Sequence, residues 1–537
     1  MLRKASVLLV LLGALFSGSA SAYDVQLGPF KDEENDYAKE SIYTLSALGI
    51  VNGYEDRTFR PNEPLSREAF VKLLVSANRL NPGKDQGGFP ADVAASRWSA
   101  PYIAVAYERQ WIDSLLDKKG LFHPSQTITR QEVALLAGTT LLDAETEEVR
   151  SQWLKADWKK ERDRRAFKDR SSIAASLQPY VYYATYRGIM EGDAAGFMPK
   201  EPLIRKQAAA VIYRMIDKQV SAEKLRFTGF YAIQSYSALS QMSKLSDVVL
   251  GWSHLEYGEE GKASLNTTAT VHRMPSGYEE VLGAADAAGI PKELMVFYDG
   301  SNLRDFLKDG PAQAAFLSEL LAALRNPADS FSGVTIDFEG LKEAASAADY
   351  VGFLRDLKAR LGEFTLSVAV PPVDYYKGYE LREIGKLADT VILMAYDYTH
   401  NESKLPSAPL PLVNDAVVTA LESIPKEKLV LGISKQANQW ITVSGVTGDA
   451  LNPAIADVEK RLGMPGVAKT FEMPYFLTKA VFTDERGSHE IYYEDKSSIA
   501  KKLWLAKFYG LKGVSLWFMG NFTAEDWKLV GEQSTRN

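Results

Sequence analysis

The chain has 537 residues, of which 46% are hydrophobic, 62 are Lys or Arg and 69 are Asp or Glu, so its formal net charge is −7. A mildly acidic chain is a poor candidate for nucleic-acid binding, and a chain of this length can bury several cores. The absence of cysteine excludes thiol catalysis and cysteine-ligated zinc. The five histidines are scattered without an H-E-x-x-H spacing, and we expect no metal site.

Residues 1–22 have the pattern of a secretory signal. Two basic residues precede an apolar run over residues 7–16, and small residues follow at 20–22. This run is too short for a membrane span, and no later stretch reaches about 18–20 uninterrupted apolar residues. We therefore predict an exported protein that begins near Tyr23 and has no integral membrane span after signal removal.

The next part of the chain contains three copies of one pattern, with a period of about sixty residues. Each copy has a Phe and an Asp, an amphipathic helix, a loop with Gly or Asp, a Phe-x-Pro step and a second amphipathic helix. We assign the copies to residues 28–82, 88–142 and 166–217, and we expect the strongly charged residues 143–165 to form an exposed helical connector. One helix pair cannot bury its apolar face alone, so the three copies should pack together.

The second helix of each copy begins with a short motif that contains arginine: LSREA at 65–69, ITRQE at 128–132 and LIRKQ at 203–207. The first two motifs place Ser66 and Thr129 at the N-cap, where a hydroxyl can accept a backbone hydrogen bond. These motifs resemble those of surface-layer homology domains.

The resemblance implies an all-α trimer of repeats that binds an anionic secondary cell-wall polysaccharide. By position it implies that Arg67, Arg130 and Arg205 contact that polymer. For any one arginine alone, a solvated charge at a helix start is the alternative. The third copy departs most, because Ile204 replaces the hydroxyl cap and Gln207 replaces the acid.

From about residue 227, short β-rich segments alternate with helical stretches. The segments are 227–235, 247–257, 293–300, 333–340, 364–372, 389–398, 428–438 and 513–521. Eight strands that alternate with helices predict an α/β fold, a (β/α)8 TIM barrel over residues 227–535. In this architecture the chemistry collects at the C-terminal ends of the strands.

The fourth predicted strand, within FSGVTIDFEG at 331–340, ends in two carboxylates. The period of two places Val334, Ile336 and Phe338 on one face, and Asp337 and Glu339 on the other. Both carboxylates should therefore project into the barrel mouth. Carboxylates that merely solvate a strand end are the alternative to catalysis.

Acidic and aromatic residues stand on other predicted strands as well. Tyr396 and Asp397 close the sixth strand, Trp517 lies on the eighth and Tyr231 on the first. Aromatic faces stack on sugar rings, and carboxylates transfer protons and stabilise positive charge, so this combination is typical of a sugar site. Taken singly, the aromatics are equally typical of a core.

Three motifs in order resemble glycoside hydrolase family 18, which includes chitinases and endo-β-N-acetylglucosaminidases. They are SGVTIDFE at 332–339, MAYD at 394–397 and SLW at 515–517, where the family has Asp-Gly-x-Asp-x-Asp-x-Glu, Met-x-Tyr-Asp and Trp. Ser332 and Thr335 replace the first two aspartates of the family motif. Thr335 retains one hydroxyl, so we expect an altered rate or pH optimum.

The resemblance implies a substrate-assisted mechanism in which the acetamido oxygen of the substrate attacks the anomeric carbon, without a cofactor. Glu339 would be the acid and base, and Asp337 would orient the acetamide and raise the pKa of Glu339. Tyr396 and Asp397 would hold the acetamido group, and Trp517 would form the pocket floor. Tyr231, Met394 and Thr335 complete the predicted substrate-binding residues.

These inferences predict a cell-surface-anchored hydrolase of β-linked N-acetylhexosamine glycans, with retention of configuration, in a Gram-positive type of bacterium. Chitin, peptidoglycan and N-glycans all satisfy the mechanism, and the resemblance is to the wall or spore-cortex branch of the family. Two alternatives stay open: a carbohydrate-binding protein with impaired catalysis, and a structural envelope component.

Overall fold

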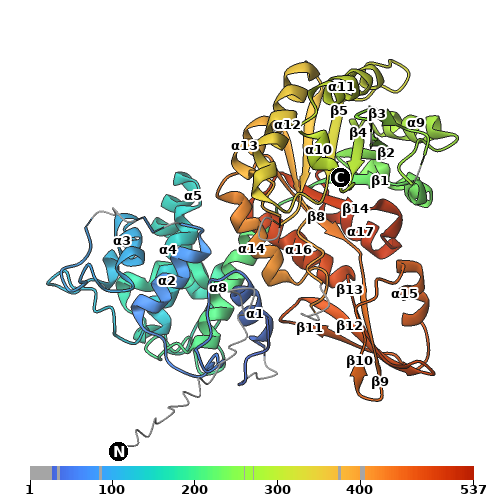
Figure 1. Cartoon of the computed structure of the whole chain (residues 1–537). Helices are drawn as coiled ribbons and strands as arrows, with labels where there is room; N and C mark the ends of the chain where they lie inside the picture. The colour runs from blue at the N-terminus through green and yellow to red at the C-terminus, as the bar shows by residue number, and fades with distance from the viewer. Residues whose placement is uncertain are drawn as a thin grey trace, which may run out of the picture.

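The computed structural model describes residues 27–32, 37–80, 82–83, 88–258, 260–269, 271–372, 376–399 and 405–536. The predicted secretory signal, residues 1–22, lies outside the described residues. A helical N-terminal part, coloured blue to green, lies beside a larger C-terminal part that contains a barrel and a second sheet (Figure 1). Within the described residues, none of the helices is long and apolar enough to cross a bilayer.

The N-terminal part contains one helix pair for each predicted repeat. The first helices are α1 (Lys39–Ala47), α3 (Ala100–Glu108) and α7 (Gln178–Tyr186), and the second helices are α2 (Arg67–Ala77), α4 (Arg130–Asp143) and α8 (Arg205–Val220). Ser66 caps α2 as predicted, because its hydroxyl accepts a hydrogen bond from Ala69 N at 3.3 Å. Ile204 has no hydroxyl to accept such a bond, but its N donates to Gln207 Oε1 at 3.2 Å, as Thr129 N donates to Glu132 Oε2 at 2.8 Å in the second repeat.

The charged connector is helical as predicted, with α5 (Glu147–Gln152), a π-helical turn (Trp153–Asp157) and α6 (Trp158–Arg165). It is not wholly exposed, which corrects the expectation from its charge. Trp153 is buried because its indole packs edge-on against Tyr183 with ring centroids 4.9 Å apart. Glu161 is buried beneath Arg164 and Arg165, which both pair with its carboxylate.

The Asp of each repeat closes that repeat's loop. Asp32, Asp92 and Asp169 each accept hydrogen bonds of 2.7–2.9 Å from two consecutive backbone N–H groups, those of the Phe-x-Pro phenylalanine and of the residue after it. Short β-bridges join the repeats in a ring, from Pro64 to Ile204 and, around the ring, from Ser66 to Thr127 and from Thr129 to Pro202. The three copies therefore pack as one unit, which is why the pattern needs all three.

The C-terminal part is a closed parallel barrel, as predicted. Its strands are β1 (Arg226–Tyr231), β2 (Asp247–Tyr257), β4 (Lys292–Tyr298), β5 (Gly333–Phe338), β6 (Thr365–Val370), β7 (Thr390–Leu393), β8 (Leu429–Ser434) and β14 (Gly513–Trp517). They pair in the order β1-β14-β8-β7-β6-β5-β4-β2, and the pairing of β1 with β2 closes the barrel. Each lies within a segment predicted from the sequence, to within one residue at its start.

Helices surround the barrel (Figure 1). They are α9 (Tyr278–Ala288), α10 (Leu303–Phe306), α11 (Gly310–Leu324), α12 (Ala347–Leu361), α13 (Leu381–Leu387), α14 (Leu410–Leu421), α16 (Lys496–Tyr509) and α17 (Ala524–Gln533). Val334, Ile336 and Phe338 of β5 are buried in the core beneath these helices, which confirms their predicted face. A separate cluster takes one apolar residue from each of six strands, namely Phe230, Val249, Met295, Ala369, Ile392 and Val430, and this set fills the barrel interior.

A second sheet, which the sequence analysis did not foresee, is inserted between β8 and α16. It contains β9 (Asn438–Val443), β10 (Val446–Thr447), β11 (Ala468–Glu472), β12 (Leu477–Asp484) and β13 (Gly487–Tyr493), all antiparallel, with α15 (Ile455–Leu462) against it. A short strand β3 (Ala263–Asn266) also pairs with β2. The inserted strands are partly exposed, so they lack the continuous apolar runs that mark the barrel strands.

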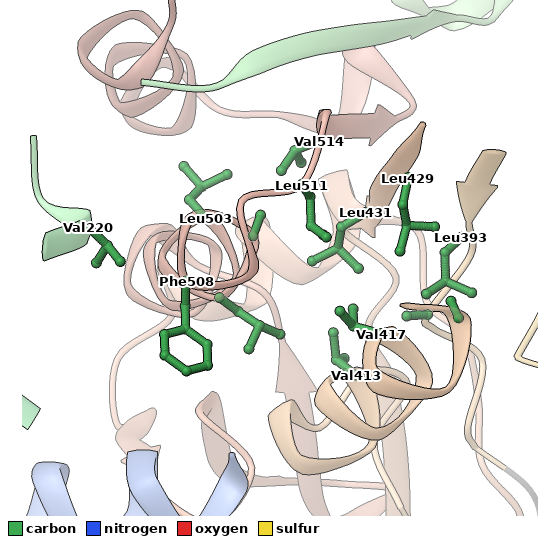
Figure 2. Packing of buried hydrophobic residues seen from close by; sticks show 14 of the residues in the cluster. Val220, Leu393, Val413, Val417, Leu429, Leu431, Leu503, Phe508, Leu511 and Val514 are labelled. Carbon is green, nitrogen blue, oxygen red and sulfur yellow. The ribbon is translucent and has the colours of Figure 1, made fainter. Parts of the chain in front are cut away.

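The two parts share one apolar core. Figure 2 shows Val220, the last residue of α8, beside Leu503 of α16, and the ring of Phe508 directed toward the N-terminal helices. The guanidinium of Arg79 lies 5.4 Å from the centre of the Phe508 ring and donates a hydrogen bond to Phe508 O. The repeats are therefore packed directly on the barrel.

A buried lysine supplies the polar contacts of the same interface. Lys501 of α16 is 8% exposed, and its Nζ donates to Glu40 Oε1 at 2.7 Å, to Tyr213 OH at 3.2 Å and to Thr44 Oγ1 at 3.3 Å. The ring of Trp504, one turn further along α16, stacks on Tyr213 with centroids 5.9 Å apart. All donors of this lysine thus point into the helical repeats.

Candidate functional site

The two carboxylates of β5 lie at the C-terminal end of the barrel. Asp337 is 2% exposed within the strand, and Glu339 follows the strand end with a partly exposed side chain. Glu339 N donates to Tyr298 O on the neighbouring strand at 2.8 Å. This backbone bond holds the Glu339 side chain at the rim.

Asp337 is buried without a donor for one of its oxygens. No described residue hydrogen-bonds to its Oδ1. Burial raises the pKa of Asp337 well above its usual range, and the charge of Glu339 raises it further. A buried carboxyl that lacks a donor for one oxygen is more stable in its neutral form, which is why the pKa of Asp337 is raised.

Burial also raises the pKa of Glu339, to about 7, and the negative charges of Asp397 and Asp299 add to this effect. The sequence predicted a raised pKa here but named Asp337 as its source. Burial is the first cause, and the like charges of Asp337 and Glu339 act on each other, since the charge of Glu339 raises the pKa of Asp337. A carboxyl with a pKa near 7 is suited to act as a general acid at neutral pH.

Tyr396 and Asp397 lie in the loop after β7, three and four residues beyond the strand. The Tyr396 ring lies against Gly432 of β8, where an added Cβ would come 3.1 Å from Tyr396 Cε1. Asp397 has a φ of 64°, in the left-handed region, and its N donates to Ser407 Oγ at 3.1 Å. An unfavourable backbone held by surrounding contacts is common at functional sites.

Burial raises the pKa of Asp397, although hydrogen bonds from Gln436 and Ser407 to its carboxylate lower it. Gln436 follows β8 and Ser407 precedes α14. Neither residue was predicted, because nothing in the local sequence marks them. Their contact with Asp397 depends on the neighbouring positions of β7 and β8 in the barrel.

Glu339, Tyr396 and Asp397 line one cavity of about 350 Å³, a volume typical of ligand sites. Met394 lines it too, as predicted, together with Tyr376, which the sequence analysis missed. Burial raises the pKa of Tyr376, and the charges of Glu339 and Asp397 raise it further, so its hydroxyl lies near both carboxylates. Two acids and three tyrosines therefore line the cavity, since Tyr398 lies in its wall as well.

Trp517 and Tyr231 lie on opposite sides of the barrel wall, Trp517 inside the barrel and Tyr231 outside it. Trp517 ends β14, and its ring packs edge-to-face on Phe230 in the barrel interior with centroids 5.2 Å apart. Tyr231 is 2% exposed and packs edge-to-face on Trp252, in the core between barrel and helices. The expectation that Tyr231 faces the mouth is corrected, because the alternation along β1 directs Phe230 inward instead.

Ser332 and Thr335, which replace the first two aspartates of the family motif, form hydrogen bonds to residues of the neighbouring strand β4. Thr335 Oγ1 donates to Glu293 Oε2 at 2.7 Å, and Thr365 Oγ1 donates to Glu293 Oε1 at 2.7 Å. Ser332 Oγ donates to Lys292 O at 2.9 Å. Thr335 is therefore on the predicted interior face but beneath Asp337, where it satisfies a buried carboxyl on β4.

The three motif arginines hold the ring of repeats together. Arg67 Nη1 donates to Phe122 O at 2.7 Å, Arg130 Nε to Phe197 O at 3.0 Å and Arg205 Nε to Phe59 O at 2.8 Å. Each arginine thus binds the Phe-x-Pro loop of the next repeat around the ring. Each guanidinium makes a second contact through its Nη2, with Glu132 for Arg67, with Glu191 O for Arg130 and with Asn52 O for Arg205.

The three positions differ in what else surrounds them. Arg67 is 7% exposed and pairs with Glu132 at 2.5 Å, so its charge is already neutralised. Arg130 and Arg205 are partly exposed and have no carboxylate within ion-pair distance among the described residues. Arg130 lines a cavity of about 370 Å³ with Arg214, a second cation that the sequence analysis did not single out.

A corresponding second cation lies near Arg205. Lys72 Nζ in the first repeat donates to Ile50 O at 2.8 Å, as Arg214 Nη1 in the third repeat donates to Ile189 O at 3.0 Å. Burial lowers the pKa of Lys72, and the nearby charge of Arg205 lowers it further. Two of the three junctions between repeats therefore hold a pair of cations.

A second groove in the described part of the chain contains none of the predicted catalytic residues. It is an open groove of about 1230 Å³ that lies along the connector and α7. Within the described ranges, no group of three or more His, Asp or Glu is arranged to hold a metal ion.

Comparison with known families agrees with both resemblances. The model of glycosyl hydrolases family 18 matches residues 297–521, which include the ends of β4, β5, β7 and β14. The barrel belongs to glycosyl hydrolases family 18. The model of the S-layer homology domain matches residues 29–71, 91–134 and 166–209, one match for each helix pair.

The family 18 barrel has relatives among spore enzymes. The chain is 29% identical over 248 residues to the cortical fragment-lytic enzyme of Bacillus subtilis (strain 168), with 43% of this chain and 56% of that protein covered. It is also 29% identical over 217 residues to a candidate sporulation-specific glycosylase of the same organism, with 37% of this chain and 50% of that protein covered. The chain thus spans about half the length of these curated relatives.

A solved structure shares the fold. The C-terminal domain of a candidate chitinase from Desulfitobacterium hafniense DCB-2 is 20% identical, with a TM-score of 0.50, and the match covers 58% of this chain and 99% of that chain. This likeness supports the barrel architecture.

Proposed function

We propose that this protein is a surface-anchored glycoside hydrolase that cleaves β-linked N-acetylhexosamine glycans by substrate-assisted, retaining catalysis. The observation that carries the proposal is Glu339, a carboxyl with a pKa of about 7 in a cavity it shares with Tyr396 and Asp397. At neutral pH a substantial fraction of Glu339 is protonated and can donate its proton to the glycosidic oxygen. Membership of family 18 supports the assignment.

Asp337 completes the mechanism. Its Oδ1 has no partner among the described residues, so a substrate acetamide N–H can supply the donor that is missing. That hydrogen bond stabilises the Asp337 carboxylate and leaves the shared proton on Glu339. The acetamide oxygen then attacks the anomeric carbon, the glycosidic bond breaks, and the proton of Glu339 passes to the leaving oxygen.

The second half of the reaction reverses these roles. Glu339, now a carboxylate, takes a proton from a water molecule that attacks the anomeric carbon and opens the oxazolinium ring. Asp337 stabilises the positive charge of that ring, while Tyr396 and Asp397 hold the acetamido group. Trp517 and Met394 provide an apolar floor for the sugar.

We infer that the helical repeats attach the enzyme to a cell-wall polysaccharide. The paired cations Arg130 with Arg214, and Arg205 with Lys72, suit an anionic polymer. The match to S-layer homology domains supports surface association. A wall or cortex glycan is the substrate class that this placement favours, and the spore-enzyme relatives favour it as well.

Hydrolysis by residues 23–537 tests the enzymatic proposal. The protein is incubated with purified peptidoglycan and with chitin oligosaccharides, and new reducing ends are identified by mass spectrometry. Glu339→Gln should abolish cleavage, whereas Glu343→Gln should not, because Glu343 is an exposed neighbour that pairs with Arg304. Binding without cleavage by the unmodified protein would contradict the proposal and favour a carbohydrate-binding protein.

A further inference from the structure

One lysine lies in the acidic active-site cavity without a function in the mechanism above. Lys342 follows Glu339 by three residues and lines the same cavity, where it is the one cation among the described lining residues. Its side chain is exposed, and it forms no hydrogen bond or ion pair with any residue that the structure describes. A cation placed in a binding cavity without a partner is a candidate ligand contact.

The backbone fixes this lysine at the rim. Lys377 N donates to Lys342 O at 3.1 Å, and Gly378 N donates to Leu341 O at 3.0 Å. The approach is so close that a Cβ added to Gly378 would lie 2.6 Å from Leu341 Cβ. The pairing brings a second exposed lysine, Lys377, beside the first, next to Tyr376 in the cavity wall.

Lys342 does not serve as a counter-ion for the catalytic carboxylates. The pKa values of Glu339 and Asp397 are raised, whereas an adjacent cation that paired with either would lower them. The chain as a whole carries a net charge of −7, which repels an anionic polymer. Local cations at the cavity rim therefore decide where such a polymer can approach.

We propose that Lys342, supported by Lys377, binds a carboxylate on the sugar next to the cleaved N-acetylhexosamine. The substrate would then be an acidic glycan whose neighbouring sugars bear carboxyl groups, such as the lactyl carboxyl of an N-acetylmuramic acid that carries no peptide, and not a neutral polymer of the chitin type. This inference rests on the proposed function and specifies its substrate class. A lysine suits this role because its flexible stem reaches a carboxylate without a fixed geometry.

The test compares one glycan with and without its charge. Soluble peptidoglycan fragments from which the peptides have been removed, so that the lactyl carboxyl groups are free, are compared with the same fragments after these carboxyl groups are amidated. Both are given to the unmodified protein, to Lys342→Met and to Lys308→Met. The last change removes an exposed lysine outside the cavity and is the matched control. We expect the unmodified protein and the control to prefer the charged fragments by about three- to tenfold in kcat/KM.

In Lys342→Met this preference should disappear, because cleavage of the charged fragments falls while cleavage of the amidated fragments stays unchanged. High salt should reduce the preference of the unmodified protein in the same way. Equal cleavage of both fragments by the unmodified protein would overturn the inference and leave the proposed function intact. An equal loss on both fragments in Lys342→Met would overturn it too, since that result indicates a structural role.

If the proposed enzymatic function is wrong, the unmodified protein will cleave none of the fragments. Equilibrium binding then tests the charge contact directly, with Glu339→Gln as the background so that no turnover occurs. Tighter binding of charged than of amidated fragments, lost when Lys342→Met is added, supports the carboxylate contact. Equal binding of the two fragments contradicts it.

Discussion

The ring of Tyr396 rests on Gly432: a Cβ atom at position 432 would lie 3.1 Å from Tyr396 Cε1 and 2.9 Å from Leu393 O. The adjacent strands β7 and β8 thus set the position of the Tyr396 side chain, which we propose to contact the acetamido group of the substrate. The tolerance at this contact is small, because a gap below 3.4 Å forces one of the two groups to move.

We therefore expect Gly432→Ala to reduce kcat/KM by about tenfold or more, since a misplaced catalytic group is costly. The free energy of unfolding should fall by about 1–3 kcal/mol, because the added methyl overpacks the barrel. Gly352→Ala in α12 is the control, because an added Cβ meets nothing within 4 Å there. Kinetics beside chemical denaturation separate the two effects, and full activity in Gly432→Ala would contradict the proposed position of Tyr396.

Asp299 should influence the pH profile without touching the substrate. Its charge raises the pKa of Glu339, so Asp299→Asn lowers that pKa and Glu339 loses its proton at a lower pH. The alkaline limb of kcat should move downward by a few tenths of a pH unit, because Asp299 is exposed and screened by salt. The shift should shrink at 1 M salt, and a shift in the opposite direction would exclude Glu339 as the titrating acid.

Glu339 should make the stability of the protein depend on pH. The folded-state pKa of about 7 lies above the ordinary value of 4.5, so the folded protein binds this proton more tightly than the unfolded chain does. The resulting stability is fully present below pH 4.5 and is lost as the pH rises through about 7. Relative to Glu339→Gln, the unmodified protein should lose about 1–3 kcal/mol of unfolding free energy between pH 4 and pH 8. Urea denaturation at both pH values measures this difference.

The motif arginines should separate into two classes. Arg67→Gln leaves Glu132 buried without its partner and should cost about 3–5 kcal/mol of unfolding free energy. Arg130→Gln removes two hydrogen bonds to backbone carbonyls at a partly exposed site and should cost only about 1 kcal/mol. Sedimentation with purified cell walls should show weakened binding in Arg130→Gln while the protein remains folded. Unimpaired wall binding by the double variant Arg130→Gln, Arg205→Gln would contradict the anchoring proposal.

The interface between repeats and barrel should depend on Lys501. Lys501→Met removes three hydrogen bonds and leaves Glu40 without its cation, so we expect a loss of about 2 kcal/mol in unfolding free energy. Lys528→Met, an exposed lysine on α17, should change the stability by less than about 0.5 kcal/mol. Calorimetry reports the coupling: the unmodified protein should unfold in one transition, and the variant should show separate transitions for the repeats and the barrel.

Several features were predictable from the sequence because they depend on short-range periodicity. The period of two along β5 placed Val334, Ile336 and Phe338 in the core and Asp337 on the interior face. The alternation of β-rich and helical segments predicted the barrel, and the repeated Phe, Asp and Phe-x-Pro steps predicted three packed helix pairs. Local spacing is sufficient for such inferences, since the pleat and the helical turn impose it.

Tertiary structure alone decided which side chains meet. Tyr231 turned away from the mouth, Arg67 became buried against Glu132, and Gln436 reached Asp397 across two strands. Burial and the charges of Asp397 and Asp299, which are distant in the chain, also raise the pKa of Glu339, and the sequence did not predict these causes. Contacts of this kind arise from strand order and packing between distant segments, and desolvation depends on everything that surrounds a group, so neither is encoded in the spacing of neighbouring residues.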